Sequence, residues 1–305
     1  MKKKVLIVLA LIMAAALVLT SCDELMGEDN SGPCTVKWAG IRISTYGMRS
    51  SFGKDNFPSE TQMAGFATNM ASCYEGSTGA YVLIVGEIHS NGCTLYFPVT
   101  GNYENIEGSK TDRYESYLDE CDKQGISVWL QVEPGYGDLV TLADLVMKRY
   151  GHHSCVKGFG IDVEWHKPVE GADEGTKLSD SVAKNVLAKV RSYNPEYTVF
   201  VKHWDMRWLP SKIEGLIYVN DSQQFDNMTQ VKNEFSEWAA YYAPQPVMFQ
   251  IGYNADKAIW NGTDYASNPA KLFGQAIVDA CNSGNDVGII WVDMTLSQVI
   301  NKTGN

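Results

Sequence analysis

The chain has 305 residues, and 36 acidic side chains outnumber 25 basic ones, which gives a formal net charge of −11. A surface of this sign repels phosphate backbones and anionic bilayer surfaces, so nucleic acid is excluded as an expected partner. A neutral ligand such as a sugar remains compatible with it.

The first 22 residues have the pattern of an export signal. Three lysines, residues 2–4, precede an apolar run over 5–19, and Leu19-Thr20-Ser21-Cys22 follows. A charged start, a short apolar run and small residues before the cut are typical of a signal peptide. The ending resembles the lipobox of bacterial lipoproteins, in which the cysteine becomes the lipidated first residue. We therefore expect a signal peptide over 1–21, a lipid such as palmitate on Cys22 and a location in the cell envelope, anchored to a bacterial membrane.

Residues 22–33 are polar and are predicted to form a tether behind the lipid. Loss of residues 1–21 removes three lysines, so the mature chain carries 22 basic and 36 acidic side chains and a formal charge of −14. The body over 34–305 has no Gly/Ser-rich or Pro-rich interruption and is long enough for one large domain. We expect this domain to be a monomer that needs no cofactor.

The body alternates short apolar runs with amphipathic stretches. The runs lack clean polar alternation, as expected for parallel strands that are covered on both faces. The predicted strands are residues 38–45, 80–85, 127–132, 158–163, 198–202, 216–219, 247–251 and 287–292. The predicted helices are residues 59–71, 112–124, 139–150, 179–193, 229–242 and 268–283.

Eight strands of similar length in about 270 residues favour a closed (β/α)8 barrel over an open doubly wound sheet. No G-x-G-x-x-G follows the first strand, which argues against a dinucleotide-binding sheet. His89-Ser-Asn-Gly92 resembles a hairpin turn and predicts an added strand over 93–99, after strand two.

Six cysteines follow Cys22, and their spacings match no compact zinc motif. An exported chain permits disulfides, and both disulfide pairing and isolated buried thiols stay open. The pair His152-His153 precedes strand four in a loop and is expected to be solvated surface.

Strand four carries the most informative pattern, Lys157-Gly-Phe-Gly-Ile-Asp-Val-Glu-Trp165. Asp162 and Glu164 stand two residues apart, so their side chains point to the same side of an extended strand. Mutual repulsion and partial desolvation raise the pKa of one such carboxyl group and yield an acid that can donate a proton near neutral pH. The alternative is a pair of solvated acids that cap the next loop.

Other polar and aromatic residues stand at the predicted carboxyl ends of the strands, where barrels of this kind place their active sites. Amides and acids suit sugar hydroxyls, and aromatic faces suit the C–H surfaces of sugar rings. The predicted substrate-binding residues are Glu133, Trp204, Asn220, Asp221, Gln250, Tyr253 and Trp291.

At these residues the chain resembles the family 18 glycoside hydrolases, the chitinases and endo-β-N-acetylglucosaminidases, whose fourth strand carries D-G-x-D-x-D-x-E. The Gly and the final Asp-x-Glu agree with residues 157–164, whereas Lys157 and Gly160 stand where the family has two earlier aspartates. The resemblance implies that Glu164 is the general acid and that Asp162 holds the 2-acetamido group as that group attacks the anomeric carbon. It also implies that Asp221 belongs to the site and that Trp291 is the floor of the sugar pocket.

Three alternatives stay open. The chain can be a lipid-anchored glycan-binding protein on a hydrolase scaffold, in which the missing aspartates have ended turnover unless another acid, such as Glu133, substitutes. Family 25 lysozymes also carry Asp-x-Glu on a barrel strand, but the first strand here has no acid near its start. A divalent cation held by Asp162, Glu164 and His166 with His203 and Asp205 is the third, although no compact metal motif is present.

Overall fold

The computed structural model describes residues 32–53, 57–169 and 175–302. The predicted signal peptide, Cys22 and most of the tether lie outside the described residues. Residues from Gly32 onward form one compact unit. Within the described part of the chain, no helix is both long enough and apolar enough to cross a bilayer.

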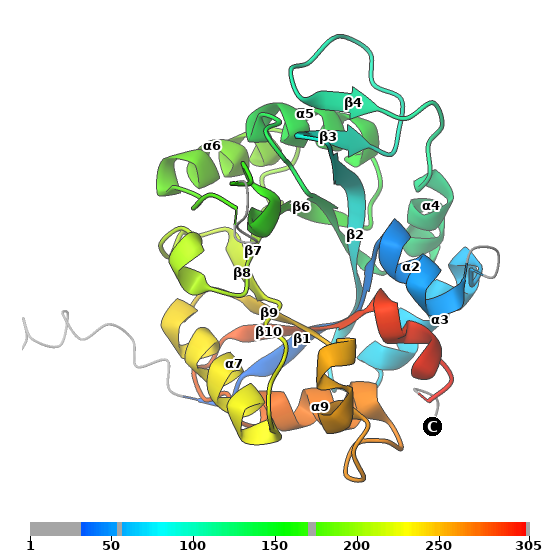
Figure 1. Ribbon diagram of the computed structural model, residues 1–305, viewed down its shortest axis with the longest axis vertical. Helices are drawn as coiled ribbons and strands as arrows, with labels where there is room; N and C mark the ends of the chain where they lie inside the picture. The colour runs from blue at the N-terminus through cyan, green and yellow to red at the C-terminus, as the bar shows by residue number, and fades with distance from the viewer. Residues whose placement is uncertain (1–31, 54–56, 170–174, 303–305) are drawn as a thin grey trace, which may run out of the picture. The chain divides into compact units, whose positions relative to one another are not determined.

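Eight parallel strands close into a barrel, as the sequence predicts (Figure 1). They are β1 (Thr35–Ile43), β2 (Thr78–His89), β5 (Ser127–Val132), β6 (Val156–Asp162), β7 (Thr198–Lys202), β8 (Leu216–Asn220), β9 (Val247–Ile251) and β10 (Asp286–Val292). Strand β1 pairs in parallel with both β10 and β2, and this double pairing joins the first strand to the last. The bounds of β5, β7 and β9 agree with the sequence prediction residue for residue.

The helices lie around the outside of the strands (Figure 1). They are α2 (Thr45–Phe52), α3 (Glu60–Ala71), α4 (Glu115–Gln124), α5 (Leu139–Tyr150), α6 (Asp180–Arg191), α7 (Met228–Tyr242), α8 (Lys257–Trp260) and α9 (Pro269–Val278). The capping box that the sequence predicts is present, because Ser59 and Gln62 exchange side-chain and backbone hydrogen bonds at the start of α3. Helix α2 was not predicted, because its sequence is mostly polar; Ser44 caps it by accepting from the backbone of Gly47.

The predicted hairpin is also present. Strand β3 (Gly92–Leu95) runs antiparallel to the end of β2, and a short strand β4 (Ile106–Gly108) pairs with β3. The added strand ends four residues earlier than predicted. The six cysteines of the described chain are free thiols, of which Cys34, Cys93, Cys121, Cys155 and Cys281 are buried.

The two faces of the barrel strands have different neighbours. One face packs against the helices in a large apolar cluster. The other fills the barrel interior with a separate cluster made of Ala80, Val82, Trp129, Phe200, Ile217, Val219, Met248 and Ile290. Gly160 on β6 makes room for one of these residues, because a Cβ atom at this position would lie 2.1 Å from Cζ of Phe200.

Replacement of Gly160 by Ala is therefore expected to destabilise the fold by about 1–3 kcal/mol, the usual cost of overpacking a filled core. Urea unfolding monitored by circular dichroism measures the change. Gly65→Ala is the matched control, since Gly65 lies inside helix α3 with open space around its Cα, and the replacement should stabilise by up to about 1 kcal/mol. Equal effects of the two substitutions would contradict the packing assigned to Gly160.

Candidate functional site at the carboxyl ends of the strands

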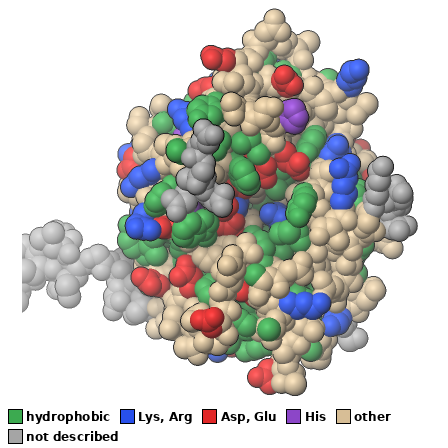
Figure 2. Space-filling view, in the orientation of Figure 1, with side chains coloured by type: hydrophobic (Ala, Val, Ile, Leu, Met, Phe, Trp, Pro, Cys, Tyr) green, Lys and Arg blue, Asp and Glu red, His purple; other side chains and the backbone are tan. Residues whose placement is uncertain are grey.

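A cavity of about 330 Å³ opens at the carboxyl ends of the barrel strands. Acidic and basic side chains meet in the hollow at the centre of this face, with apolar side chains around it (Figure 2). The cavity is lined by Arg42, Ser44, Tyr46, Ile84, Glu87, Ile88, Glu133, Asp162, Glu164, Trp165, Lys202, Asp221, Gln223, Tyr253 and Met294. The strand-four carboxylates thus lie in this cavity and not in the helix layer, as the sequence predicts.

The ammonium group of Lys202 lies among three carboxyl groups of this cavity. Its Nζ atom is 3.1 Å from Oδ2 of Asp162 and 3.0 Å from Oε1 of Glu164, and it also donates to Oδ2 of Asp221. A lysine has three N–H donors, so all of them are used here. Burial alone would lower the pKa of Lys202, but the three carboxyl groups outweigh it and raise this pKa well above its ordinary value. Lys202 is therefore a fixed cation.

Lys202 is not among the residues that the sequence pattern predicts for the site. A signal is nevertheless present, because a lysine that ends an otherwise apolar strand is buried at a cost unless it finds partners. Strand β7 alternates, with Phe200 in the barrel interior, so the side chain two positions later points to the same side.

Two of the acids around Lys202, Glu164 and Asp221, have pKa values that are shifted in opposite directions. Burial, and next the negative charge of Asp221, raise the pKa of Glu164 well above its ordinary value. For Asp221, burial is outweighed by the charge of Lys202 and by the hydrogen bond from Glu164, and its pKa is lowered. These opposite shifts favour a proton on Glu164 over one on Asp221, and Oε1 of Glu164 accepts from Lys202. The sequence-based expectation that one carboxyl of this strand end holds a proton near neutral pH agrees with this arrangement.

Asp162 is held from two sides but keeps one free oxygen. Its Oδ2 accepts from Nε2 of Gln131 at 3.0 Å in addition to Lys202, whereas its buried Oδ1 has no hydrogen-bond partner. Burial raises the pKa of Asp162 to about 6 against the opposing charge of Lys202. Oδ1 of Asp221 is likewise buried and unpartnered. Two buried acceptor oxygens beside the cavity therefore lack a hydrogen-bond partner.

Glu133 faces the same cavity from the end of β5. Its Oε2 accepts from the backbone N–H of Ile88 at 3.3 Å. Burial, and next the charge of Asp162, raise the pKa of Glu133 to about 7. Glu133 and Asp162 therefore interact across the cavity, and Asp162 is also paired with Lys202.

A second ion pair joins the first and last strands at the cavity wall. Nη2 of Arg42 on β1 lies 3.0 Å from Oδ1 of Asp293, which directly follows β10 and is fully buried. The other oxygen of Asp293 accepts from the backbone N–H and from the hydroxyl of Ser44. The edge of the cavity therefore depends on contacts between the two ends of the domain.

The structure places the remaining predicted binding residues in different surroundings. Tyr253 lines the cavity and donates to Oε1 of Gln250, which is buried beneath it. Trp204 is 39% exposed and lines an adjoining cavity of about 480 Å³ that shares Glu164 and Asp221 with the first.

Besides the buried Gln250, two further predicted residues do not reach the cavity. Asn220 is buried and donates to Glu234 of helix α7. Trp291 is fully buried, packs edge-on against Trp260 and donates to Thr295, so it is no floor of a pocket. Its neighbour Ile290 belongs to the barrel interior, and successive side chains of a strand point to opposite faces.

The arrangement also explains the departure from D-G-x-D-x-D-x-E. The phenyl ring of Phe200 lies where a side chain at position 160 would extend. The partner of Asp162 is the ammonium group of Lys202 on the next strand, in place of a carboxylic acid on its own strand.

The structure does not support the alternative prediction of a divalent-cation site at this rim. The ammonium of Lys202 occupies the space between Asp162 and Glu164, and Nδ1 of His166 contacts the backbone oxygen of Thr176 at 3.0 Å. Among the described residues, groups of ligand-type side chains close enough for one ion lie at Glu115, Asp122 and the histidine pair before β6.

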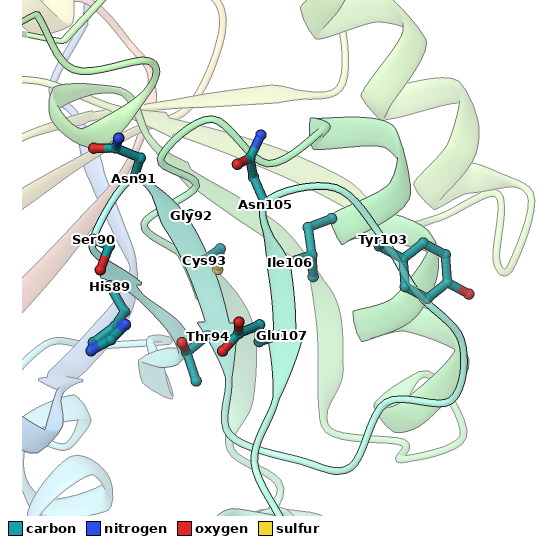
Figure 3. Close-up of a pocket in the computed structure, with 10 residues that line it drawn as sticks. All are labelled: His89, Ser90, Asn91, Gly92, Cys93, Thr94, Tyr103, Asn105, Ile106 and Glu107. Atoms are coloured by element: carbon teal, nitrogen blue, oxygen red, sulfur yellow. The ribbon is translucent and has the colours of Figure 1, made fainter.

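A further cavity, of about 400 Å³, lies at the hairpin between β2 and β3 (Figure 3). Its side chains lie apart, with Asn91 and Asn105 at one end and Tyr103 at the far side (Figure 3). It brings no carboxyl groups together, because Glu107 is its single acid. The rim cavity is therefore the candidate site.

No family model and no curated protein matches the chain. Among solved structures, it is similar to a putative α-L-fucosidase from Bacteroides thetaiotaomicron (13% identity, TM-score 0.48, 88% of each chain covered). It is also similar to endo-glycoceramidase II from a Rhodococcus species (11% identity, TM-score 0.47, 86% of this chain and 75% of that one). A third is the β-glucuronidase of Parabacteroides merdae (12% identity, TM-score 0.47, 84% of this chain), of which the chain spans only 31%. Likeness at this level carries no argument about activity.

Stability should depend on pH through Glu133. A carboxyl group whose pKa rises from about 4.5 to about 7 on folding binds its proton more tightly in the native state. The free energy of unfolding therefore falls as pH rises from 4.5 to 7, by up to about 3 kcal/mol at 1.36 kcal/mol per pKa unit. Urea unfolding at several pH values should show this slope in the wild type and a smaller one in Glu133→Gln. Identical slopes would contradict the raised pKa.

Replacement of Lys202 by Met keeps an unbranched side chain as far as Cε but removes the ammonium group, so its carboxyl partners are left without a cation. Loss of one partner from a buried ion pair costs about 3–5 kcal/mol, and we expect the free energy of unfolding at pH 7 to fall by that amount. Lys189→Met is the matched control, because Lys189 is 35% exposed beside Asp144 and its loss should cost less than about 1 kcal/mol. A cost below 1 kcal/mol for Lys202→Met would show that the carboxyl groups do not depend on it.

Proposed function

We propose that the protein is a glycoside hydrolase that acts on glycans containing N-acetylglucosamine. The observation that carries the proposal is the group formed by Lys202 with Asp162, Glu164 and Asp221, in which a protonated carboxyl and an ionised one face the same cavity. Paired carboxyl groups whose environments separate their pKa values are the machinery of glycoside hydrolysis.

In the proposed reaction, Glu164 donates its proton to the glycosidic oxygen as the bond to the anomeric carbon breaks. The carbonyl oxygen of the substrate's own 2-acetamido group attacks this carbon and forms a cyclic oxazolinium ion. The unpartnered Oδ1 of Asp162 accepts the N–H of the acetamido group and supports the positive charge. Water then opens the ring, Glu164 takes up the proton of this water, and the product retains the anomeric configuration.

Lys202 supports both halves of this cycle. Its ammonium stabilises the carboxylate that Glu164 becomes after proton transfer, and it keeps Asp162 oriented while Oδ1 stays available. Asp221 receives the hydrogen bond of Glu164 in the resting state and keeps the proton on the correct group.

The mouth of the site suits a chain of several sugar units. Trp165 and Trp204 are 41% and 39% exposed, and each lines one of the two adjoining cavities. Exposed indole faces beside acidic side chains bind sugar rings by their C–H surfaces and leave the hydroxyls to the polar groups. We therefore expect binding of oligosaccharides to extend across both cavities.

The experiment compares the hydrolysis of an aryl chitobioside, a high-mannose glycopeptide and an aryl cellobioside, which lacks the acetamido group. Glu164→Gln should lower kcat on the first two by about 10²–10⁴-fold, because the amide keeps the shape of the side chain but has no proton to give. Asp162→Asn should lower it comparably, and the cellobioside should not be cleaved. Glu237→Gln, an exposed acid on helix α7, is the matched control and should keep wild-type rates.

The outcomes separate the competing functions. Undiminished turnover in Glu164→Gln would overturn the assignment of the acid. Cleavage of the cellobioside at similar rates would replace the acetamido mechanism by direct attack of a carboxylate. Peptidoglycan is assayed as a fourth substrate, and its cleavage without cleavage of the other three would favour a muramidase of the family 25 kind. Binding of chitobiose without any cleavage would favour a glycan-binding protein.

A further inference from the structure

A cluster of polar side chains lies away from the proposed active site, at the loop between helix α5 and strand β6. This loop carries His152 and His153, and Glu115 begins the neighbouring helix α4. Nε2 of each histidine is 3.6 Å from Oε1 of Glu115. The expectation that both histidines are solvated surface is wrong for His153, which is 3% exposed because the loop folds back onto α4. Its Nε2 atom is buried and has no hydrogen-bond partner.

The proton on the His153 ring is fixed by its other nitrogen. Nδ1 lies 2.8 Å from Oδ2 of Asp122, whose other oxygen accepts from the hydroxyl of Ser154 and from the backbone N–H of Cys155. The carboxylate of Asp122 is thus positioned to accept from Nδ1 of His153, and the other ring nitrogen, the unpartnered Nε2, faces Glu115. A carboxylate that orients the ring in this way is the usual partner of a metal-binding histidine.

Glu115 offers one free oxygen to this space. Its Oε2 accepts from Nη2 of Arg149 at 2.8 Å, which leaves Oε1 facing the two imidazole nitrogens. The carboxylate oxygen and the two imidazole nitrogens all lie within 4.8 Å of one another, which is close enough for one metal ion to bind all three. The 3.6 Å separations are longer than hydrogen bonds but close to the ~3.3 Å that separates two ligands of a tetrahedral ion with metal–ligand bonds of ~2.0 Å.

We propose that Oε1 of Glu115 and the Nε2 atoms of His152 and His153 bind a divalent zinc ion, with water as the fourth ligand. Two imidazoles and one carboxylate are a ligand set that zinc uses. The ion has a route from solvent, because the side chain of His152 is 59% exposed. Bound zinc fastens the loop before β6 to helix α4, so this site stabilises the barrel independently of the proposed hydrolysis.

The test uses tag-free protein that has been stripped with EDTA and dialysed. Titration with ZnCl2, followed by calorimetry and by competition with a chromophoric chelator, should give one zinc ion per chain. Glu115→Gln and His152→Ala should each weaken binding by at least about 100-fold, and Asp122→Asn, which keeps all three ligands, by about 10–100-fold. Cobalt in place of zinc should give the visible absorption bands of a tetrahedral ion, and these should disappear in Glu115→Gln.

His89→Ala is the matched control, since His89 is an exposed histidine of the hairpin, and it should bind zinc like the wild type. Zinc should raise the melting temperature of the wild type and of His89→Ala but not that of Glu115→Gln. Circular dichroism confirms that each variant is folded before titration. Absence of zinc binding by the wild type would overturn the proposal. Zinc affinities of Glu115→Gln and His152→Ala equal to that of the wild type would also overturn it and leave adventitious binding only.

Discussion

A buried ammonium group surrounded by carboxyl groups needs every one of its contacts, and the rim of this barrel is arranged to supply them. Lys202 cannot lose its charge while Asp162, Glu164 and Asp221 surround it, and these acids cannot approach one another without it. Asp162 ends β6, Lys202 ends β7 and Asp221 directly follows β8, so three adjacent strands bring the charges of this group together. The separation of the site into one neutral acid and ionised neighbours is a result of the same requirement.

The barrel meets this requirement through the alternation of its strands. Every second residue of each strand points into the barrel interior, and the last residue of this set lies at the rim. Phe200 is therefore followed by Lys202, Val219 by Asp221 and Gly160 by Asp162, each pair two residues apart. A closely packed apolar layer beneath the charged one excludes water from below and keeps the effective dielectric constant low.

Local sequence patterns predicted most of the fold but only part of the site. Apolar runs of similar length predicted all eight strands, and Ser59 with Gln62 predicted the start of a helix. Both signals depend only on residues that are close together in the chain, so the sequence shows them directly. The role of Lys202 depends on acids that two other strands supply, and the burial of His153 depends on packing against α4. The resemblance to family 18 and a position near the end of the last strand placed Trp291 in the pocket, but neither signal tells which face of the strand its side chain occupies, and it packs among the residues that face the helices.

The contacts of Asp293 with Arg42 and Ser44 have a consequence for biosynthesis. They connect residues about 250 positions apart, and they close the barrel where its first strand meets its last. A nascent chain that lacks β10 and Asp293 thus has an open sheet edge beside an arginine without this carboxylate partner, and its pocket lacks one wall. Such long-range closure is slow compared with the formation of helices and neighbouring strand pairs. Any glycan recognised at this rim therefore meets a competent pocket only after the whole domain has been synthesised and closed.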